Sequence, residues 1–454
     1  MATEAALDDS TLAAIDEQLR DTDAHLGNDY PGERDARQAV HTVYVPADVY
    51  TPDLPAVWGQ RALDAVGEHG GMLRLAQRVV EASREEPGLV RPLGVHDDAP
   101  DAQEIESLAA AVTQKLREEP IEDLRIDFED GFGNRPDEEE DSLAIAAAEH
   151  VAQTIAQGSS PAFVGIRFKC LEAPVRRRGL RTLDLFVSTL IRAHGGVPEQ
   201  LVLTLPKVST VEQIRAMVTA CRALERALDL ADGSLRFEVQ VETPQLILGA
   251  DGLITIAPAL HAGEGRITSL HYGTYDYSAS VGVAAAYQAM DHPAADFAKQ
   301  HMQLAVAGTG VHLSDGSTNL LPVGDAETVN AAWGLHAALI RRHLQSGIYQ
   351  GWDLHPSQLP TRFLATFLFF REGFGSAARR LRNYVFKESS GVLDEPATAK
   401  ALARYLARGL ACGAVSAQEL NEATGVGPDD LAHLARTGLL PDHSAHQTEE
   451  RNSQ

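Results

Sequence analysis

The stretch RFEVQVETPQ, residues 236–245, shows the pattern that decides the fold: a short β-rich run that ends in a polar residue, here the acidic Glu242. Seven further β-rich runs are separated by longer helical patterns, which is typical of βα units around a parallel sheet. They are HTVYVP from His41, LRIDFE from Leu124, AFVGIR from Ala162, LVLTLPK from Leu201, TSLHYG from Thr268, AVAGTGVHLSD from Ala305 and GWDLHP from Gly351. Eight such runs predict an α/β fold, a TIM (β/α)8 barrel with an N-terminal helical extension and a C-terminal helical arm.

The patterns outside these runs predict the domain organisation. We expect an N-terminal helical extension over residues 1–40, with a helix from roughly Thr11 to Leu26, and the barrel over residues 41–360. A helical arm that completes the site follows over 361–410, then a helical hairpin over 411–440 and a disordered tail over 441–454. The first two runs lie about eighty residues apart, which leaves two alternatives open: two or three extra helices, or one more strand.

Composition excludes several classes of protein. The 454 residues are 44% hydrophobic and 23% charged, and no run of eighteen apolar residues is present that could span a bilayer. The formal net charge of -25 repels a phosphate backbone, so we expect no nucleic-acid partner even for the C-terminal helix pair, which resembles a helix-turn-helix. The acidic N-terminus and the three scattered cysteines favour a cytoplasmic protein without disulfides.

Polar residues end several of the β-rich runs. In a TIM barrel the chemistry lies at the C-terminal ends of the strands, so such residues are candidates for one shared site. Any one of them alone is also explained by a strand that reaches solvent, but their number favours a site. The candidates are Glu129, Asp130, Arg167, Lys207, Glu242, Asp276, Asp315 and His355.

Glu242 and Asp276 are the candidates for a metal site. Two carboxylates, water and a chelating substrate match the oxygen-rich shell that Mg²⁺ prefers, and Mn²⁺ accepts the same ligands. The guanidinium of Arg167 could then bind a carboxylate or stabilise an enolate oxygen, which suits a small 2-oxo acid. The sequence contains no Walker loop, no GxGxxG after a strand and no GxSxG elbow, so nucleotide binding and serine hydrolysis are not indicated.

Seven segments, taken in order, resemble one known family. They are VYVPADVY from Val43, DFEDGF from Asp127, GIRF from Gly165, VETPQ from Val241, YGTYDYSASVG from Tyr272, LHPSQ from Leu354 and VLDEPATAKA from Val392. Together they resemble the HpcH/HpaI aldolase and citrate lyase β-subunit group, which has malate synthase and malyl-CoA lyase as relatives. The similarity runs from about His41 to Leu410.

This resemblance implies roles for individual residues. Glu242 and Asp276 would bind Mg²⁺, Arg167 would contact the oxygen of a 2-oxo acid or its enolate, and Glu129 and Asp130 would shape the metal site through water and hydrogen bonds. Asp394 matches the late acidic residue that acts as a general base in relatives. Without the resemblance, Asp394 is equally well explained as a helix N-cap in VLDEPAT. In some relatives this residue reaches a neighbouring subunit, which implies a homo-oligomer, a trimer or hexamer.

The function predicted from these residues is a Mg²⁺-dependent carbon–carbon lyase or aldolase, or the reverse Claisen condensation, on a 2-hydroxy or 2-oxo acid. Lys207, Asp315 and His355 are expected to contact the substrate or to support the metal ligands. Two alternatives stay open: a CoA-thioester hydrolase that uses the same metal site, and a non-catalytic regulatory protein that binds a dicarboxylate. The substrate also stays open, because LHPSQ follows GWD and VETPQ lacks the usual glycine. The use of CoA stays open because the sequence has no independent CoA signature, and so does the direction of the reaction.

Overall fold

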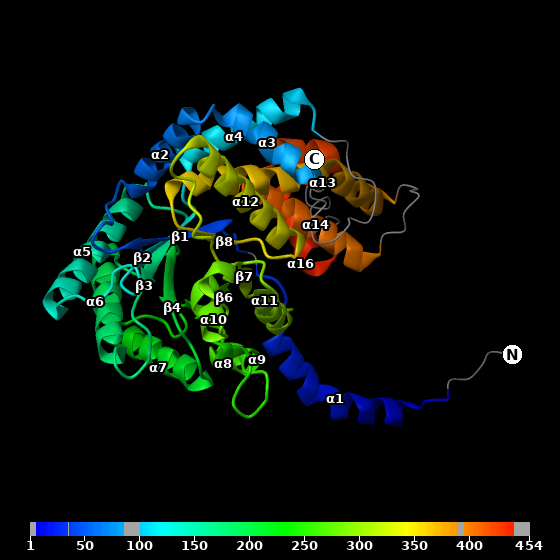
Figure 1. Cartoon of the computed structure of the whole chain (residues 1–454). Helices are drawn as coiled ribbons and strands as arrows, with labels where there is room; N and C mark the ends of the chain where they lie inside the picture. The colour runs from blue at the N-terminus through cyan, green and yellow to red at the C-terminus, as the bar shows by residue number, and fades with distance from the viewer. Residues whose placement is uncertain (1–5, 35, 86–99, 388–394, 440–454) are drawn as a thin grey trace, which may run out of the picture.

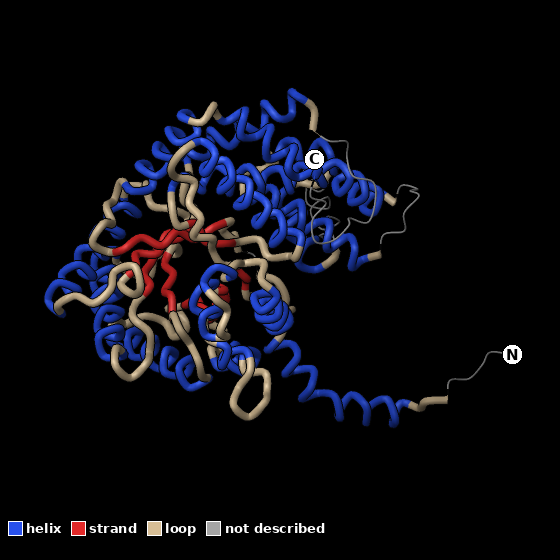
Figure 2. The backbone as a smooth tube through the Cα atoms, viewed as in Figure 1, coloured by secondary structure: helices blue, strands red, loops and turns tan. Residues whose placement is uncertain are grey.

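The computed structural model describes residues 6–34, 36–85, 100–387 and 395–439, and a single parallel sheet lies at its centre (Figures 1 and 2). The eight strands follow the order β7-β6-β5-β4-β3-β2-β1-β8, with every neighbouring pair parallel. They are β1 (His41–Pro46), β2 (Asp123–Asp127), β3 (Phe163–Arg167), β4 (Leu201–Leu205), β5 (Phe237–Val241), β6 (Ile267–Tyr272), β7 (His312–Ser314) and β8 (Gly351–Asp353).

The two edge strands close the sheet into a barrel. Ser314, the last residue of β7, forms a parallel bridge with Gln350, which directly precedes β8. The amide of Asp315 donates to the carbonyl of Gln350 at 2.8 Å, and the amide of Trp352 donates to the carbonyl of Gly316 at 3.1 Å. The predicted TIM barrel is therefore confirmed. The seventh strand is shorter than the run that predicted it, because Ala305 and Val306 belong to the preceding helix.

Helices surround the barrel, as the blue tube around the red strands shows in Figure 2. Three of them lie between β1 and β2 in the described residues, so the first of the two alternatives for this crossover fits the structure. The helices are α1 (Asp9–Asp29), α2 (Leu54–Glu68), α3 (Met72–Glu85), α4 (Ala102–Glu118), α5 (Asp137–Ala156), α6 (Arg176–His194), α7 (Val211–Ala227), α8 (Pro244–Ile247), α9 (Ile256–Ala262), α10 (Thr274–Ser280), η1 (Ala285–Tyr287), α11 (Pro293–Val306), α12 (Ala326–Gln345), η2 (Pro356–Gln358), α13 (Leu359–Phe386), α14 (Pro396–Ala411), α15 (Ala417–Thr424) and α16 (Pro428–Thr437).

Charged side chains occupy the inside of the barrel, while apolar side chains such as Ile126 and Val239 pack outward in the core. Arg125 of β2 donates from Nη2 to Glu238 of β5 at 2.8 Å, and His271 Nε2 of β6 lies 3.1 Å from the same carboxylate. Because β2 and β5 are not neighbours in the sheet, these contacts cross the interior. Glu238 is four residues before Glu242 on a parallel strand, so this network lies below the barrel's C-terminal end.

The C-terminal helices form a second packing unit. The first half of α13, up to Phe370, belongs to the barrel core, whereas its second half, from Ala377, packs with α14, α15 and α16 in a separate apolar cluster. Residue 360 lies in the first turn of α13, so the domain boundary expected there falls inside a helix. The tail over residues 441–454 lies outside the described residues.

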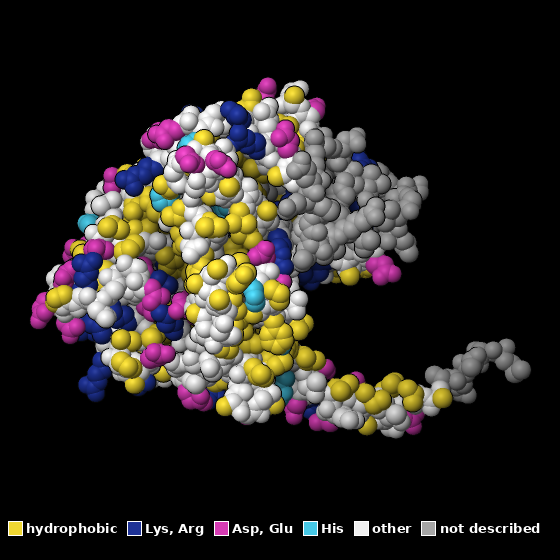
Figure 3. Space-filling view, viewed as in Figure 1, with side chains coloured by type: hydrophobic (Ala, Val, Ile, Leu, Met, Phe, Trp, Pro, Cys, Tyr) yellow, Lys and Arg dark blue, Asp and Glu magenta, His cyan; other side chains and the backbone are white. Residues whose placement is uncertain are grey.

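The N-terminal helix α1 extends away from the body of the molecule (Figure 1), and none of its residues is buried. Apolar side chains are visible along it in the space-filling view (Figure 3), and the exposed apolar residues of α1 include Leu12, Ile15 and Leu19. Within the described ranges no helix combines the length and the apolar character that crossing a bilayer requires.

Candidate active site

An arginine and an aspartate form the floor of the site at the C-terminal ends of β2 and β3. Arg167 donates from Nε and Nη2 to the two carboxylate oxygens of Asp127, at 2.6 and 2.7 Å. This two-point pairing fixes the orientation of the guanidinium group. The ring centre of Tyr44 lies 4.8 Å from its Cζ. Nη1 is the part of the guanidinium that Asp127 does not use, with Gln240 Oε1 at 3.5 Å and Glu129 Oε2 at 3.7 Å. Arg167 can therefore offer one more donor to a bound oxygen.

The turn after β2 is built around the same aspartate. Asp127 accepts hydrogen bonds from the amides of Glu129 and Gly131, at 3.0 and 2.9 Å. A Cβ at position 131 would lie only 2.8 Å from Asp127 Oδ2, so glycine is needed for this close approach. The DFEDGF segment thus folds back over its own carboxylate, which places Glu129 above Arg167.

Glu242 is the carboxylate directly after β5, and only 2% of it is exposed. It accepts a hydrogen bond from the backbone amide of Lys207 at 3.0 Å and makes no ion pair with any described residue. Burial, then the charges of Asp276 and Glu129, raise the pKa of Glu242 to about 8, although Arg167 opposes the shift. A Cβ on Gly273 would come within 2.3 Å of Glu242 Cγ, so that glycine makes room for the carboxylate. Among the described residues, Glu242 is therefore a buried acid without an ion-pair partner.

Lys207 brings the remaining acids together. Its ammonium lies 2.8 Å from Glu129 and 2.6 Å from Asp130, and 4.0 Å from Asp276 in the first turn of α10. The backbone of Lys207 has a φ of 50°, a left-handed conformation that costs a residue with a side chain about 1 kcal/mol. Such strain persists where surrounding contacts enforce it, and here the contacts are those of the ammonium and the amide.

The two acids after β2, Glu129 and Asp130, have pKa values shifted in opposite directions. Burial raises the pKa of Glu129 to about 7, against the opposing charge of Arg167. For Asp130, burial raises the pKa, but hydrogen bonds from Glu129 and Lys207 outweigh it and leave the pKa below the ordinary value. Asp130 is thus an anion at neutral pH, while Glu129 is poised to hold or release a proton.

These residues fit a Mg²⁺ site that relies on few protein ligands. Among the residues that the structure describes, no three His, Cys, Asp or Glu side chains converge closely enough to hold a metal by themselves. Mg²⁺ is commonly bound through one or two carboxylates and keeps several waters. A buried Glu242 without a cation, beside an Asp276 side chain that is 47% exposed, matches that requirement.

The structure does not bring all predicted residues into this cluster. The Asp315 carboxylate pairs with Lys299 of α11 at 2.9 Å and accepts from the amide of Gly316, so its contacts lie outside the barrel interior. His355 uses Nδ1 to accept from the amide of Ser357 and caps η2. Neither side chain contacts the cluster in the described part of the chain, and Asp394 lies outside the described residues.

Three residues of the site were not among the predicted ones: Tyr44, Asp127 and Gln240. Asp127 and Gln240 each lie two residues before a predicted site residue, and side chains two apart on a strand share a face. This spacing could have identified them. Tyr44 carries no comparable signal, because an aromatic residue in a strand is more often part of a core.

The sequence profile of a family described as a domain of unknown function, DUF6986, matches residues 19–438. No curated protein matches the chain. Solved structures that resemble it include native Haloferax volcanii malate synthase at 3 mM glyoxylate, with 13% identity, TM-score 0.44, and coverage of 93% of this chain and 96% of that one. The magnesium/glyoxylate complex of the same enzyme has 13% identity, TM-score 0.43, and coverage of 88% and 99%.

A Burkholderia cenocepacia J2315 protein of the HpcH/HpaI aldolase/citrate lyase family also resembles the chain. It has 18% identity and TM-score 0.32, and the match covers 55% of this chain and 85% of that one.

Proposed function

The chain belongs to the DUF6986 family of domains of unknown function, and we propose that it is a Mg²⁺-dependent carbon–carbon lyase or aldolase. Its substrate would be a small 2-hydroxy or 2-oxo acid, free or as a CoA thioester, and the reverse condensation uses the same site. The observation that carries this proposal is Glu242, a buried carboxylate at a strand end that has no cationic partner among the described residues.

Glu242 and Asp276 would hold the metal. Leaving a carboxylate buried without a cation is costly, and its pKa of about 8 reflects that cost. When bound, Mg²⁺ would polarise the 2-oxo oxygen and favour negative charge as it develops there. The partly exposed side chain of Asp276 leaves room for water and for the substrate on its side of the site.

Arg167 would bind the oxygen that gains charge during bond cleavage. Breaking the carbon–carbon bond of a 2-hydroxy acid leaves an electron pair on the adjacent carbon, which spreads onto a carbonyl oxygen as an enolate. Arg167 is oriented by Asp127 before the substrate arrives, so Nη1, which Asp127 does not use, can donate to that oxygen. Gln240 and Tyr44 limit where this guanidinium can move.

The proton transfers need a second group. The resemblance assigns the base to Asp394, which would take a proton from carbon in the condensation and return it in cleavage. Glu129, with its pKa near 7, would hold the proton of the hydroxyl group. Lys207, hydrogen-bonded to Glu129, would position that carboxyl group over Arg167.

Calorimetry with Mg²⁺ and a panel of 2-oxo acids tests this function. We expect glyoxylate, pyruvate or oxaloacetate to bind only in the presence of Mg²⁺, and Glu242→Gln to abolish this dependence. Glu212→Gln removes an exposed carboxylate from α7 and is the matched control. If no acid binds in a metal-dependent way, or if Glu242→Gln binds Mg²⁺ like the parent, the proposal is wrong.

Product analysis separates this function from thioester hydrolysis. A lyase acting on a hydroxyacyl-CoA releases a 2-oxo acid together with a shorter thioester, whereas a hydrolase releases free thiol and no 2-oxo acid. Coupled detection of thiol and 2-oxo acid in one reaction distinguishes the two.

A further inference from the structure

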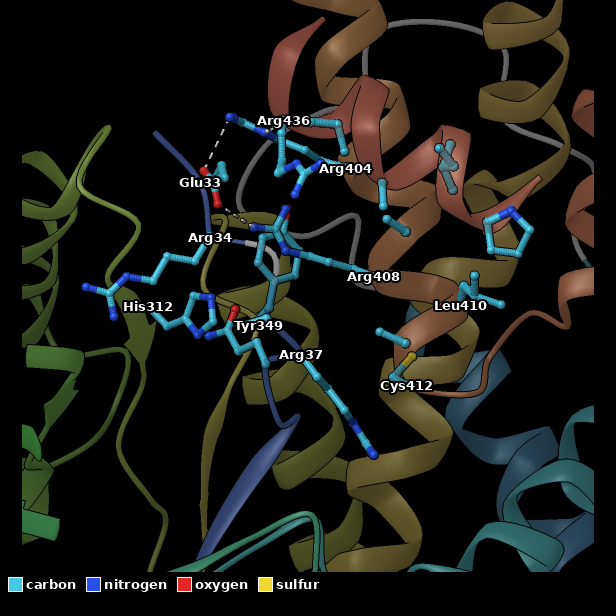
Figure 4. Close-up of a pocket in the computed structure, with 18 of the residues that line it drawn as sticks. Glu33, Arg34, Arg37, His312, Tyr349, Arg404, Arg408, Leu410, Cys412 and Arg436 are labelled. Atoms are coloured by element: carbon cyan, nitrogen blue, oxygen red, sulfur yellow. Dashed lines mark hydrogen bonds and ion pairs between the residues drawn. The ribbon is translucent and has the colours of Figure 1, made fainter. Parts of the chain in front are cut away.

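A cavity lies at the opposite, N-terminal end of the barrel from the candidate active site. Its floor includes His312, the first residue of β7, and Tyr349, which precedes β8. One wall is the link after α1, which contains Glu33, and the other is formed by α14 and α16 (Figure 4). The cavity has a volume of about 280 Å³, which is enough for a small metabolite. No residue of the candidate active site lines it.

Arginines dominate its polar lining. Arg404 and Arg408 of α14 both approach the single carboxylate of Glu33, at 3.5 and 4.0 Å, and Arg436 of α16 lines the same wall. Arg34 and Arg37 turn their guanidinium groups elsewhere, to the carbonyl of Gly265 and to Glu119 respectively (Figure 4). Among the described lining residues, one carboxylate shared by two half-buried guanidinium groups leaves an excess of positive charge, in a protein whose net charge is -25.

The remaining described lining residues add no negative charge: they include an aromatic ring that packs against Arg408, a neutral histidine and apolar side chains. The side chain of Arg408 lies over the ring of Tyr349, with Cζ 4.2 Å from the ring centre, so its position is held by packing. Burial, and next the charge of Arg408, lower the pKa of His312 to about 4, so its ring is neutral at pH 7. Leu410 and Leu431 supply an apolar side to the cavity. A bare inorganic ion would leave that side uncovered, whereas a short carbon chain would fill it.

We propose that this cavity is a binding site for a compact organic anion that carries carboxylate or phosphate groups. Arg404 and Arg408 would pair with its charged groups, which are better ligands for a guanidinium than the single Glu33 that two arginines share. The ligand would join α14 to the barrel floor and to the link after α1. This site is independent of the chemistry proposed for the other end of the barrel.

The position of the cavity gives it a structural connection to the candidate active site. His312 begins the three-residue strand β7, and the residues that follow this strand contact α10. The amide of Ser317 donates to Thr274 Oγ1 at 3.1 Å, and the amide of Asn319 donates to the hydroxyl of Tyr275. Asp276 is the next residue of α10, so a ligand at His312 lies one short strand away from the helix that carries a proposed metal ligand.

Titration calorimetry on the full chain tests the site. Citrate and glycerol 3-phosphate are the probes, one for each kind of charged group, in metal-free buffer of constant ionic strength. All titrations use the Glu242→Gln variant, which removes metal-dependent binding at the other end. Absence of probe binding is therefore distinguishable from failure of the proposed function. We expect one probe at least to bind at one site per chain, and Arg404→Gln and Arg408→Gln each to weaken it about tenfold.

Matched variants distinguish the site from general charge effects. Arg192→Gln removes an equal charge from the exposed last turn of α6, and it should leave probe affinity unchanged. Arg404→Lys and Arg408→Lys keep the charge and should retain part of the probe affinity. Thermal unfolding of every variant shows whether a loss of binding follows from misfolding. The proposal is overturned if neither probe binds at millimolar concentration, or if folded Arg404→Gln and Arg408→Gln bind as well as Arg192→Gln.

Discussion

The two ends of the barrel have opposite charge patterns. At the C-terminal end, three carboxylates lie within 4.0 Å of one lysine ammonium, and Glu242 is buried nearby without a cation. At the N-terminal end, two guanidinium groups share one glutamate. In the described part of the chain, one end thus has a deficit of positive charge, and the other has an excess. Incomplete neutralisation destabilises a fold, and this pattern is consistent with the two proposals, a cation bound at one end and an anion at the other.

Between the two ends, the buried acids of the barrel interior have a cation in direct contact. Arg125 pairs with both Asp123 and Glu238, and Thr204 donates to Glu238 at 2.6 Å. Glu238 lies in β5 and Glu242 directly follows it, four residues later. The charge of Arg125, followed by His271, lowers the pKa of Glu238 against the effect of burial, whereas burial raises the pKa of Glu242. Among the described residues, Glu238 thus has a cation in direct contact, whereas Glu242 makes no ion pair.

Arg167→Lys should produce the largest effect at the C-terminal end. Lysine retains the charge but loses the planar fork that binds both oxygens of Asp127, so the donor to the substrate oxygen is no longer oriented. We expect turnover to fall about a hundredfold with Mg²⁺ affinity nearly unchanged. Steady-state kinetics and calorimetry measure the two quantities. Equal losses of turnover and metal affinity would assign Arg167 to the metal site instead.

Gly273→Ala should weaken metal binding without removing a charged group. The added Cβ would lie 2.3 Å from Glu242 Cγ, so the carboxylate must move away from its position after β5. We expect about a tenfold loss of Mg²⁺ affinity, since small displacements of a ligand are costly for a metal that demands regular geometry. Gly334→Ala on α12 is the control, because a Cβ there meets no atom within 4 Å. Unchanged Mg²⁺ affinity in a folded Gly273→Ala variant would count against Glu242 as a ligand.

The barrel was predictable from the sequence because its strands are apolar runs that end in polar residues. β1 begins at His41, and β8 at Gly351, as the patterns predict. The start of the seventh strand was predicted too early, at Ala305, although Ala305 and Val306 belong to α11. Apolar residues occur in buried helices as well as in strands, so the pattern alone does not separate the two. Short runs of this kind do not distinguish the two, and tertiary packing decides between them.

The candidate site was predictable only where proximity follows from topology. Residues at the ends of parallel strands converge, which is why Glu242, Arg167 and Lys207 are found together. The partner of Asp315 is Lys299, a residue on a helix, and no strand-end rule brings those two together. The cavity at the N-terminal end depends on how α14 packs against the link after α1, and that packing is not encoded in any local pattern.

The pH dependence of stability should distinguish the two ends in the metal-free protein. The pKa of Glu242 rises from an ordinary value of 4.5 to about 8 on folding, so between these values the folded chain keeps a proton that the unfolded chain has released. The stability that Glu242 contributes is therefore full below pH about 4.5 and is lost as the pH rises to about 8. Thermal unfolding should show this decline, and Glu242→Gln should lack it. Mg²⁺ affinity should increase across the same pH range, because the metal requires the deprotonated carboxylate.

Glu33→Gln should have the smallest effect, and it should change only the cavity at the N-terminal end of the barrel. Removing this carboxylate leaves Arg404 and Arg408 without the one acid that they share, so the positive potential of the cavity increases. An anion would then bind several-fold more tightly, while the Mg²⁺ affinity and the turnover at the other end stay the same. Calorimetry with citrate or glycerol 3-phosphate measures the gain, and Glu17→Gln on the exposed helix α1 is the charge-matched control. Weaker anion binding in Glu33→Gln would show instead that Glu33 holds the two arginines in place for the ligand.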